Sequence, residues 1–372
     1  RNLGFSVTSA PLGAQQHEPR LSSAKLRMDP TIVTPESATQ AVRLSFLHAY
    51  LEDRVHGRTV SLQQYQERFL GYEELIAREH AELVERGATD DARYTRRGTL
   101  GSGGMGVIYR VWDESLGREL AMKVLIPRND ADAARPGHAA RAWRRFVNEA
   151  KVTGRLQHPG VVAVHDLGIG RDGIPFFVMP LVEGESFDAI IAHVHAGNRN
   201  GWTLPRAVEV LHQVCDVMAF AHSRQVVHRD LKPHNVMVGA FGEVHVMDWG
   251  LARELDAEER DGGVDPIDAE SAFVTLDGDV IGTPAYMPPE QAAGNIEDVD
   301  QASDIYSLGA ILYNLVTGGA PHCDGDQRLS PQTILVKVLE KTPTPIPNLT
   351  RSAPAELVAI IQKAMAREKS DR

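Results

Sequence analysis

The chain has 372 residues, of which 42% are hydrophobic and 24% charged, and this composition excludes a collagen-like, mucin-like or wholly disordered protein. Its formal net charge of −11 lacks the basic excess that drives non-specific binding to nucleic acids, so no nucleic-acid partner is expected. No run approaches the roughly 18 apolar residues of a membrane helix, and two cysteines cannot build a disulfide framework, which predicts a cytoplasmic protein without membrane contact in this segment.

Two segments precede the first predicted strand. Residues 1–30 are rich in Ser, Pro, Gly and Gln without an apolar period, which predicts disorder. Residues 31–93, the helical extension, begin with apolar residues at helical spacing, at Val42, Phe46, Ala49 and Tyr50. Ser61 is a candidate N-cap for a second helix, and Gly71 allows a break after it. These few helices are too small for a core of their own, so we expect docking on the next domain or on a second copy, as a homodimer.

From residue 94 the pattern changes to short β-branched runs. Three of them predict an antiparallel meander, over residues 95–100, 107–112 and 119–125. A helix over 141–156 and two further strands, over 161–168 and 175–182, are expected next. After residue 203 the chain is mostly helical, and one long helix carries an apolar face at Val208, Leu211, Cys215, Met218 and Ala221. Cys215 is therefore expected in the core.

A glycine-rich turn joins the first two predicted strands. Residues 100–107 read L-G-S-G-G-M-G-V, in which Gly101, Gly103 and Gly106 form a G-x-G-x-x-G motif. The same glycines occur in dinucleotide-binding turns, but those lead into a helix, whereas residues 107–111 alternate as a strand. Because glycines let the backbone close over phosphate groups without Cβ clashes, the turn predicts a phosphate-binding loop.

Lys123 lies in an apolar strand, two residues after the small Ala121, which leaves room for an adenine ring. A buried lysine is rare unless it is paired, so Lys123 requires an acidic partner. Glu149, in the helix that follows, is the candidate. Such a pair would aim the ammonium group at the α- and β-phosphates of a nucleotide.

The most specific signal is the octapeptide H-R-D-L-K-P-H-N at residues 228–235. In it, Asp230 would accept the proton of a substrate hydroxyl, Lys232 would neutralise the transferring phosphate, and Asn235 would bind a metal ion. Asp248, in a D-W-G sequence that follows another strand, would be the second metal ligand. Carboxylate and amide oxygens suit Mg²⁺, with Mn²⁺ as the alternative.

A fifth motif completes the series, G-T-P-A-Y-M-P-P-E at residues 282–290, followed by D-I-Y-S-L-G at residues 304–309. In this order, the five motifs resemble those of the Hanks-type protein kinases, the eukaryotic-like family that also occurs in bacteria. The resemblance covers about residues 94–372, and Lys232 after Asp230 is typical of the serine/threonine branch. It implies ATP as cofactor and protein Ser or Thr hydroxyls as acceptors.

The resemblance also implies a two-lobed α+β fold. An antiparallel β N-lobe with one key helix and the hinge would span residues 94–182. A mainly helical C-lobe would span residues 183–372, and it is expected to be cut at its end because the family continues with another helix.

By the same resemblance, several residues would surround the nucleotide. Met179 takes the gatekeeper position, backbone groups of Pro180 and Val182 bind adenine, and Met237 forms the floor of its pocket. Pro180 replaces a common acidic residue but keeps the carbonyl that adenine needs. The covering loop would consist of Leu100, Gly101, Ser102, Gly103, Gly104, Met105, Gly106 and Val107.

The remaining implied roles concern the C-lobe. Thr283 would contact Asp230, Asp304 would hold the backbone of the catalytic loop, and Glu290 would pair with Arg372. Trp249 stands where the family usually has Phe, so a larger ring must pack against His228 and the Glu149 helix.

A long acidic segment between Glu254 and Asp279 carries most of the net negative charge, which is typical of a solvated loop. In the family, Arg229 binds a phosphorylated residue of this segment, and Thr275 and Ser271 are the candidates here. We therefore expect autophosphorylation to order the loop and activate the enzyme.

Three functions are candidates for this chain. The leading one is an active serine/threonine protein kinase, because every position that phosphoryl transfer requires is filled. An ATP-binding pseudokinase or scaffold stays open through Trp249 and the end at Arg372. A small-molecule phosphotransferase is disfavoured, because residues 282–290 shape a site for protein substrates.

Overall fold

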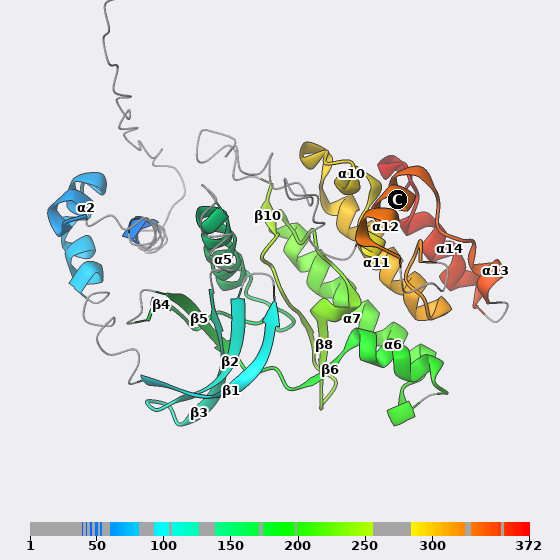
Figure 1. Ribbon diagram of the computed structural model, residues 1–372, viewed down its shortest axis with the longest axis horizontal. Helices are drawn as coiled ribbons and strands as arrows, with labels where there is room; N and C mark the ends of the chain where they lie inside the picture. Colours follow the sequence, from blue (N-terminus) through cyan, green and yellow to red (C-terminus); the bar gives the residue numbers. More distant parts are fainter. Residues whose placement is uncertain are drawn as a thin grey trace, which may run out of the picture.

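A computed structural model gives the structure of the chain (Figure 1). It describes residues 60–81, 93–103, 106–125, 138–170, 174–197, 199–255, 284–323, 329–350 and 353–372, with Thr39, Val42, Ser45, Phe46, Ala49, Tyr50 and Asp53. The predicted disordered segment at residues 1–30, the candidate phosphosites Ser271 and Thr275, and Thr283 lie outside the described residues.

The N-lobe is built on a five-stranded sheet with the order β1-β2-β3-β5-β4. Its strands are β1 (Tyr94–Gly103), β2 (Gly106–Asp113), β3 (Arg118–Val124), β4 (Asp166–Ile169) and β5 (Pro175–Pro180), and neighbours pair antiparallel. The predicted meander is therefore confirmed. The fourth strand begins later than predicted, because Val161 makes only an isolated bridge with Val246 before the chain reaches the sheet.

Successive side chains of β3 point to opposite faces of this sheet. Leu120, Met122 and Val124 belong to one apolar core, whereas Ala121 belongs to another core on the other face. Helix α5 (His138–Arg155) contributes to that second core, so Lys123, which follows the same alternation as Ala121, points toward α5.

The C-lobe is mainly helical (Figure 1). Its longer helices are α6 (Phe187–His195), α7 (Leu204–Ser223), α11 (Gln301–Thr317), α12 (Pro331–Glu340) and α14 (Ala355–Ala364). Short helices are η1 (Arg199–Gly201), η2 (Pro233–Asn235), η3 (Pro284–Tyr286), α10 (Pro289–Ala292), η4 (Ile296–Asp298), α13 (Ile346–Leu349) and η5 (Lys369–Asp371). In a three-stranded sheet, β8 (Val236–Gly239) lies between β6 (Gly184–Ser186) and β9 (Val244–Val246), and in a two-stranded sheet β7 (Val226–Val227) pairs with β10 (Arg253–Glu254). The two-lobed α+β fold is thus confirmed.

Helix α7 corrects one prediction. Thr203 caps its first turn, and Leu211, Met218 and Ala221 are buried as expected. Cys215 is exposed instead of lying in the core. The buried stripe also contains Ala207, Val210, Val214 and Val217, and its centre is therefore turned away from Cys215.

The helical extension packs against the N-lobe. Ser61 caps α2 (Leu62–Arg68) with the capping box completed by Gln64, and Gly71 breaks the helix with a φ of 87°. A further helical stretch covers residues 73–81. The buried extension residues belong to the same apolar core as α5, which matches the expectation of docking on the next domain. Within the described residues, no helix has the length and apolar character needed to cross a bilayer.

Candidate active site

A buried ion pair joins the sheet to α5. The ammonium Nζ of Lys123 lies 2.7 Å from Oε1 and 2.6 Å from Oε2 of Glu149. Both residues are buried, and Nζ also lies 5.8 Å from the centre of the Phe177 ring. The carboxylate Oδ1 of Asp248 is 3.8 Å from the same nitrogen. Three elements that are distant in sequence therefore converge on Lys123.

Burial and charge act in opposite directions on this pair. Burial alone would lower the pKa of Lys123, but the carboxylates of Glu149 and Asp248 outweigh it and raise that pKa above its ordinary value. Burial raises the pKa of Glu149 to about 7, although Lys123 opposes the shift. The two carboxylates therefore favour the charged form of Lys123, whereas burial makes the Glu149 carboxyl easier to protonate than an exposed glutamate.

The octapeptide forms a compact polar cluster. Lys232 Nζ lies 2.7 Å from Asp230 Oδ2, and the Asn235 amide Nδ2 donates to the Asp230 carbonyl over 2.8 Å and to Oδ2 over 3.3 Å. Burial raises the pKa of Asp230, while Lys232 opposes that shift. Since Asn235 uses its Nδ2 in these bonds, its amide oxygen remains to ligate a cation.

Asp304 holds the backbone of the same loop, as the resemblance implied. Its carboxylate, which is fully buried, accepts from the N–H of His228 over 2.9 Å and from that of Arg229 over 3.0 Å. His222 Nε2 lies 2.8 Å from Oδ2 of the same group. These bonds stabilise a turn in which Arg229 adopts a φ of 69°, a conformation unusual for a non-glycine residue.

Trp249 connects the D-W-G segment with the catalytic loop. Its buried indole lies 4.6 Å from the His228 ring, centroid to centroid, and its Nε1–H donates to the Val246 carbonyl over 3.1 Å. His228 Nε2 in turn donates to the Met247 carbonyl over 3.0 Å. The indole hydrogen bond is a contact that sequence reasoning missed, although a Trp in place of Phe was the signal for it.

Most of the residues predicted to surround adenine lie in the hinge or on the strands that lead to it. Ala121 in β3 and Met179 in β5 are buried and pair in register, and Pro180 ends β5. Val182 follows in the connection to the C-lobe, and Met237 lies in β8; both are half-buried.

The glycine-rich turn connects β1 with β2. Gly101, Ser102 and Gly103 end β1, Gly106 and Val107 begin β2, and Gly104 and Met105 lie outside the described residues. A Cβ at Gly106 would collide with the backbone carbonyl of Val124. Glycine is therefore required there by the close approach of β3. Leu100 is partly exposed in β1.

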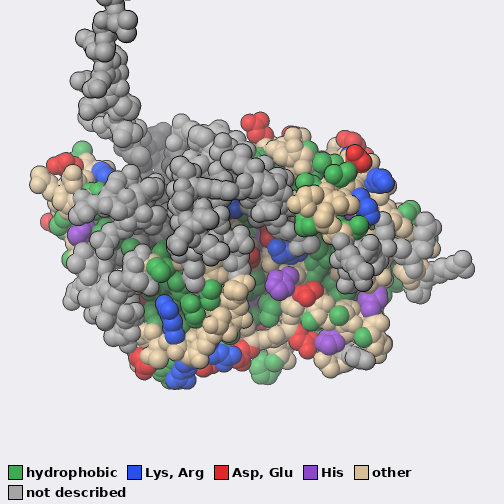
Figure 2. Space-filling view, viewed as in Figure 1, with side chains coloured by type: hydrophobic (Ala, Val, Ile, Leu, Met, Phe, Trp, Pro, Cys, Tyr) green, Lys and Arg blue, Asp and Glu red, His purple; other side chains and the backbone are tan. Residues whose placement is uncertain are grey.

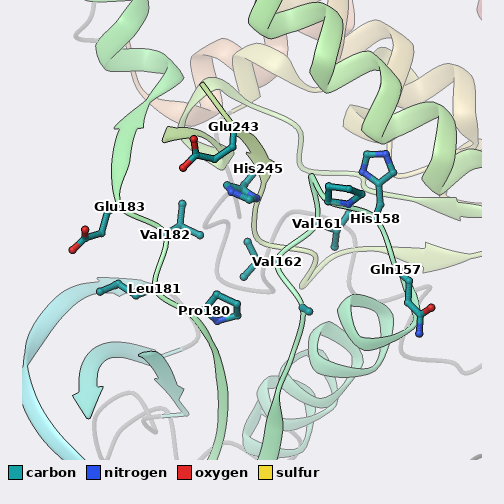
Figure 3. A pocket seen from close by; sticks show the side chains of 12 residues that line it. Gln157, His158, Val161, Val162, Pro180, Leu181, Val182, Glu183, Glu243 and His245 are labelled. Atoms are coloured by element: carbon teal, nitrogen blue, oxygen red, sulfur yellow. The ribbon is translucent and has the colours of Figure 1, made fainter. Parts of the chain in front are cut away.

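A cavity of about 410 Å³ borders the hinge (Figure 3). It is lined by residues 180–183, by the loop at 157–163 after α5, and by Glu243 and His245. Lys123, Asp230 and Asp248 do not line it. The cavity therefore lies apart from the charged cluster.

Figure 2 shows basic, acidic and histidine side chains exposed where the two lobes meet.

A second ion pair joins Arg372 to Glu290 in α10. Arg372 lies 2.6 Å and 2.8 Å from the two carboxylate oxygens of Glu290, and the Ser303 hydroxyl donates to Glu290 Oε1. Burial would raise the pKa of Glu290, but Arg372 and Ser303 hold it below its ordinary value. The neighbouring Gln291 donates to the Arg229 carbonyl over 2.7 Å, a bond that no sequence motif indicated.

The comparison with known proteins agrees with this geometry. The family profile described as "Protein kinase domain" matches residues 94–372. A probable serine/threonine-protein kinase of Corynebacterium efficiens is 35% identical over 287 residues, which cover 75% of this chain and 39% of that protein. The serine/threonine-protein kinase PknB of Mycobacterium tuberculosis is 36% identical over 284 residues, 75% of this chain and 40% of its own length. PknA of the same species is 35% identical over 266 residues, 70% of this chain and 54% of its own length. The matched regions thus cover about two fifths to one half of these relatives.

Proposed function

The chain belongs to the protein kinase family, and we propose that it is an active serine/threonine kinase, which transfers the γ-phosphate of ATP to Ser or Thr hydroxyls of protein substrates. The observation that carries this proposal is the assembled Lys123–Glu149 pair, with Asp248 3.8 Å from the same ammonium group. The names of the curated relatives support the choice of serine and threonine as acceptors.

Nucleotide binding would use the hinge, the strands beside it and the glycine-rich turn. Lys123 would hold the α- and β-phosphates, because its charge is maintained by Glu149 and Asp248. The turn at residues 101–106 would cover the phosphates with backbone N–H groups, which glycine leaves accessible. The adenine would contact Leu100, Val107, Ala121, Met179, Pro180, Val182 and Met237.

The catalytic loop would act on the acceptor. Asp230 would orient the hydroxyl and take its proton, and its raised pKa favours accepting that proton. Lys232, 2.7 Å from Asp230, would place a positive charge beside the transferring group. Asn235 and Asp248 offer the hard oxygen donors that Mg²⁺ prefers. When bound, Mg²⁺ supplies positive charge that offsets the negative charge of the phosphates.

The proposal includes a division of labour along the chain. Residues 94–182 would act as N-lobe and hinge, and residues 183–372 as the C-lobe that holds the protein substrate. Because the reaction consumes ATP, a cytoplasmic location suits it. The segment from Glu254 to Asp279 would carry the activating phosphate, on Thr275 or Ser271.

Incubation with labelled ATP and Mg²⁺ tests the proposal. We expect the chain to phosphorylate itself or a generic basic protein on Ser or Thr, and Asp230→Asn to abolish the signal. Asp216→Asn is the matched control, because this exposed aspartate of α7 lies on the surface of the C-lobe. Binding of ATP with no transfer in either chain would contradict the proposal and support an ATP-binding scaffold.

A further inference from the structure

The cavity that borders the hinge, called the hinge cavity below, has the size and the lining of a small-molecule site (Figure 3). Its volume of about 410 Å³ lies within the range of about 300–1,000 Å³ that is typical of such sites. Its lining is mostly apolar and includes Val161 and Val162, which are each 5% exposed, and Val182. Sites of this kind bury an apolar ligand body and fix its orientation through a few polar groups.

The hinge cavity is separate from the predicted nucleotide pocket. Ala121, Met179 and Met237, which the sequence places around adenine, are not among its lining residues. The two sites have Pro180 and Val182 of the hinge in common. A molecule in the hinge cavity would therefore lie beside the nucleotide without taking its place.

Main-chain hydrogen bonds hold one wall of the cavity in place. In the loop at 157–163, the N–H of Val161 donates to the His158 carbonyl over 2.9 Å. The N–H of Val246 in β9 donates to the Gly160 carbonyl over 2.8 Å, and Val161 and Val246 form a bridge. The next residue, Val162, belongs to the N-lobe core. The loop is therefore fixed to both lobes, and the cavity is preformed.

The formal charges in the lining are negative. Glu183 and Glu243 line the cavity, and no lysine or arginine does so among the described residues. Figure 3 shows both glutamates on the side of the cavity opposite Gln157. Arg110 lies 3.5 Å from Glu183, but its guanidinium group also lies 2.9 Å from Glu119 and therefore offsets only part of this charge.

Glu243 is the better positioned of the two carboxylates. Its Oε2 accepts from the N–H of Phe241 over 3.0 Å, so the turn between β8 and β9 orients the group. Gly239 leaves the space that the carboxylate occupies, because a Cβ there would overlap Oε1. A carboxylate has about four acceptor sites, so Glu243 keeps acceptor capacity for a ligand.

The two histidines of the lining add no positive charge. His158 Nδ1 accepts from the N–H of Gly160 over 3.0 Å and therefore carries no proton. Burial lowers the pKa of His245, although Glu243 and a hydrogen bond with the Pro159 backbone oppose this shift. Two carboxylates and two neutral imidazoles thus line the cavity near neutral pH, and this arrangement favours a cation over an anion.

We propose that the hinge cavity is a second ligand site, which binds a small organic amine in its protonated form. The apolar body of the amine contacts Val161, Val162 and Val182. Its ammonium group donates to Glu243, and Glu183 adds to the negative potential that attracts it.

The amine would influence the nucleotide through the two walls that the sites share. One wall is the hinge at Pro180 and Val182. The other is the β8–β9 pair, in which the lining residue His245 lies opposite Met237, the predicted floor of the adenine pocket. Coupling between two sites is reciprocal, so ATP and the amine should change each other's affinity by the same factor. This coupling rests on the proposed function, whereas binding of the amine does not.

Titration of the whole chain with 2-phenylethylamine tests the site. Methyl NMR signals of Val161 and Val162 report on the hinge cavity, and those of Met179 and Met237 report on the predicted adenine pocket. We expect the valine signals to shift with a Kd of about 1 mM or below. The neutral 2-phenylethanol and the anionic 3-phenylpropanoate should bind at least about tenfold more weakly.

Two results of this titration would overturn the proposal. One is the absence of valine shifts up to about 10 mM amine, whether or not the methionine signals move. The other is equal affinity for the three probes, because the carboxylates would then not select the ligand.

Two variants locate the bound amine. Glu243→Gln should weaken it at least about tenfold and leave 2-phenylethanol unchanged, with the exposed Glu356→Gln in α14 as matched control. Ala163→Trp should block the cavity from an exposed position of its lining, with the exposed Ala192→Trp in α6 as control. Because all four residues are exposed, the variants should keep the Tm of the parent chain. Unchanged binding in Glu243→Gln and Ala163→Trp would show that the amine binds elsewhere and would overturn the proposal.

Calorimetry measures the coupling to the nucleotide. With saturating 2-phenylethylamine, the affinity of the parent chain for ATP should change at least about threefold, and that of Ala163→Trp should not. Equal ATP affinities of the parent chain with and without the amine would overturn the coupling. A chain that binds the amine but not ATP would contradict the proposed function and support the second site.

Discussion

The His228 ring and the Trp249 indole pack 4.6 Å apart at an interplanar angle of 50°. The catalytic loop and the metal-ligand segment are thereby joined through side chains, and the His228–Met247 hydrogen bond adds a backbone connection. Asp230 lies two residues after His228 and Asp248 immediately before Trp249, so the contact helps to fix the relative position of the two carboxylates.

Trp249→Phe should preserve ring packing but remove the indole donor. The Val246 carbonyl would lose a buried hydrogen bond, which costs about 1–3 kcal/mol when a group is left unpaired. We expect a lower Tm and a kcat within about tenfold of the parent, since neither carboxylate is changed. Thermal unfolding and steady-state kinetics measure both, and an unchanged Tm would contradict the role given to the indole N–H.

The acid limb of the pH profile should report on Glu149. Its pKa is about 7, so protonation below that pH removes its charge from Lys123, and kcat/KM should fall as the pH decreases through about 7. Glu149→Gln should have low activity with this limb absent.

The raised pKa of Glu149 changes the stability of the fold with pH in the opposite direction to its effect on activity. Because the folded chain binds this proton more readily than the unfolded chain, the contribution of Glu149 to folding weakens as the pH rises from about 4.5 to 7.

Arg372→Ala should destabilise the C-lobe strongly. The Arg372 side chain is 1% exposed, and its removal would leave the Glu290 carboxylate buried without its partner. Breaking such a pair typically costs about 3–5 kcal/mol. Urea denaturation should show a lower midpoint for Arg372→Ala, a smaller loss for Arg372→Lys, and almost none for the exposed Arg78→Ala. Equal midpoints for Arg372→Ala and Arg78→Ala would refute this assignment.

Gly106→Ala should impair nucleotide binding more than overall folding. The added methyl group would collide with the Val124 carbonyl, so the end of the β1–β2 hairpin would have to move. We expect at least about a tenfold weaker affinity for ATP, measured by calorimetry. Gly98→Ala, with open space around its Cβ position, is the matched control and should bind ATP like the parent. If the two variants bound alike, the close approach of β3 would not matter for the nucleotide.

Much of this fold could be predicted because its signals are local. Alternating residues marked the first three strands, and the cap at Ser61 and the break at Gly71 appeared where their side-chain and backbone properties required them. The Lys123–Glu149 pair could also be predicted, since a lysine in an apolar strand requires a partner.

Other features depended on packing that no local pattern encodes. Cys215 has the spacing of a core residue but lies at the edge of the buried stripe of α7, because the neighbouring helices set the centre of that stripe. The Gln291–Arg229 bond joins segments whose proximity exists only after folding. The apolar core that contains Phe46 likewise includes Phe146 of α5, one hundred residues later in the chain.

Helix α5 belongs to two cores at once, since Phe146 lies in the N-lobe cluster and Val152 in that of the C-lobe. One helix therefore connects the two lobes at the place where they would rotate to admit or release a nucleotide. Such a rotation of the lobes must either tilt α5 or withdraw one of its ends from its core. Since Glu149 lies on α5 and Lys123 on β3, such a rotation would also change the position of Glu149 relative to Lys123.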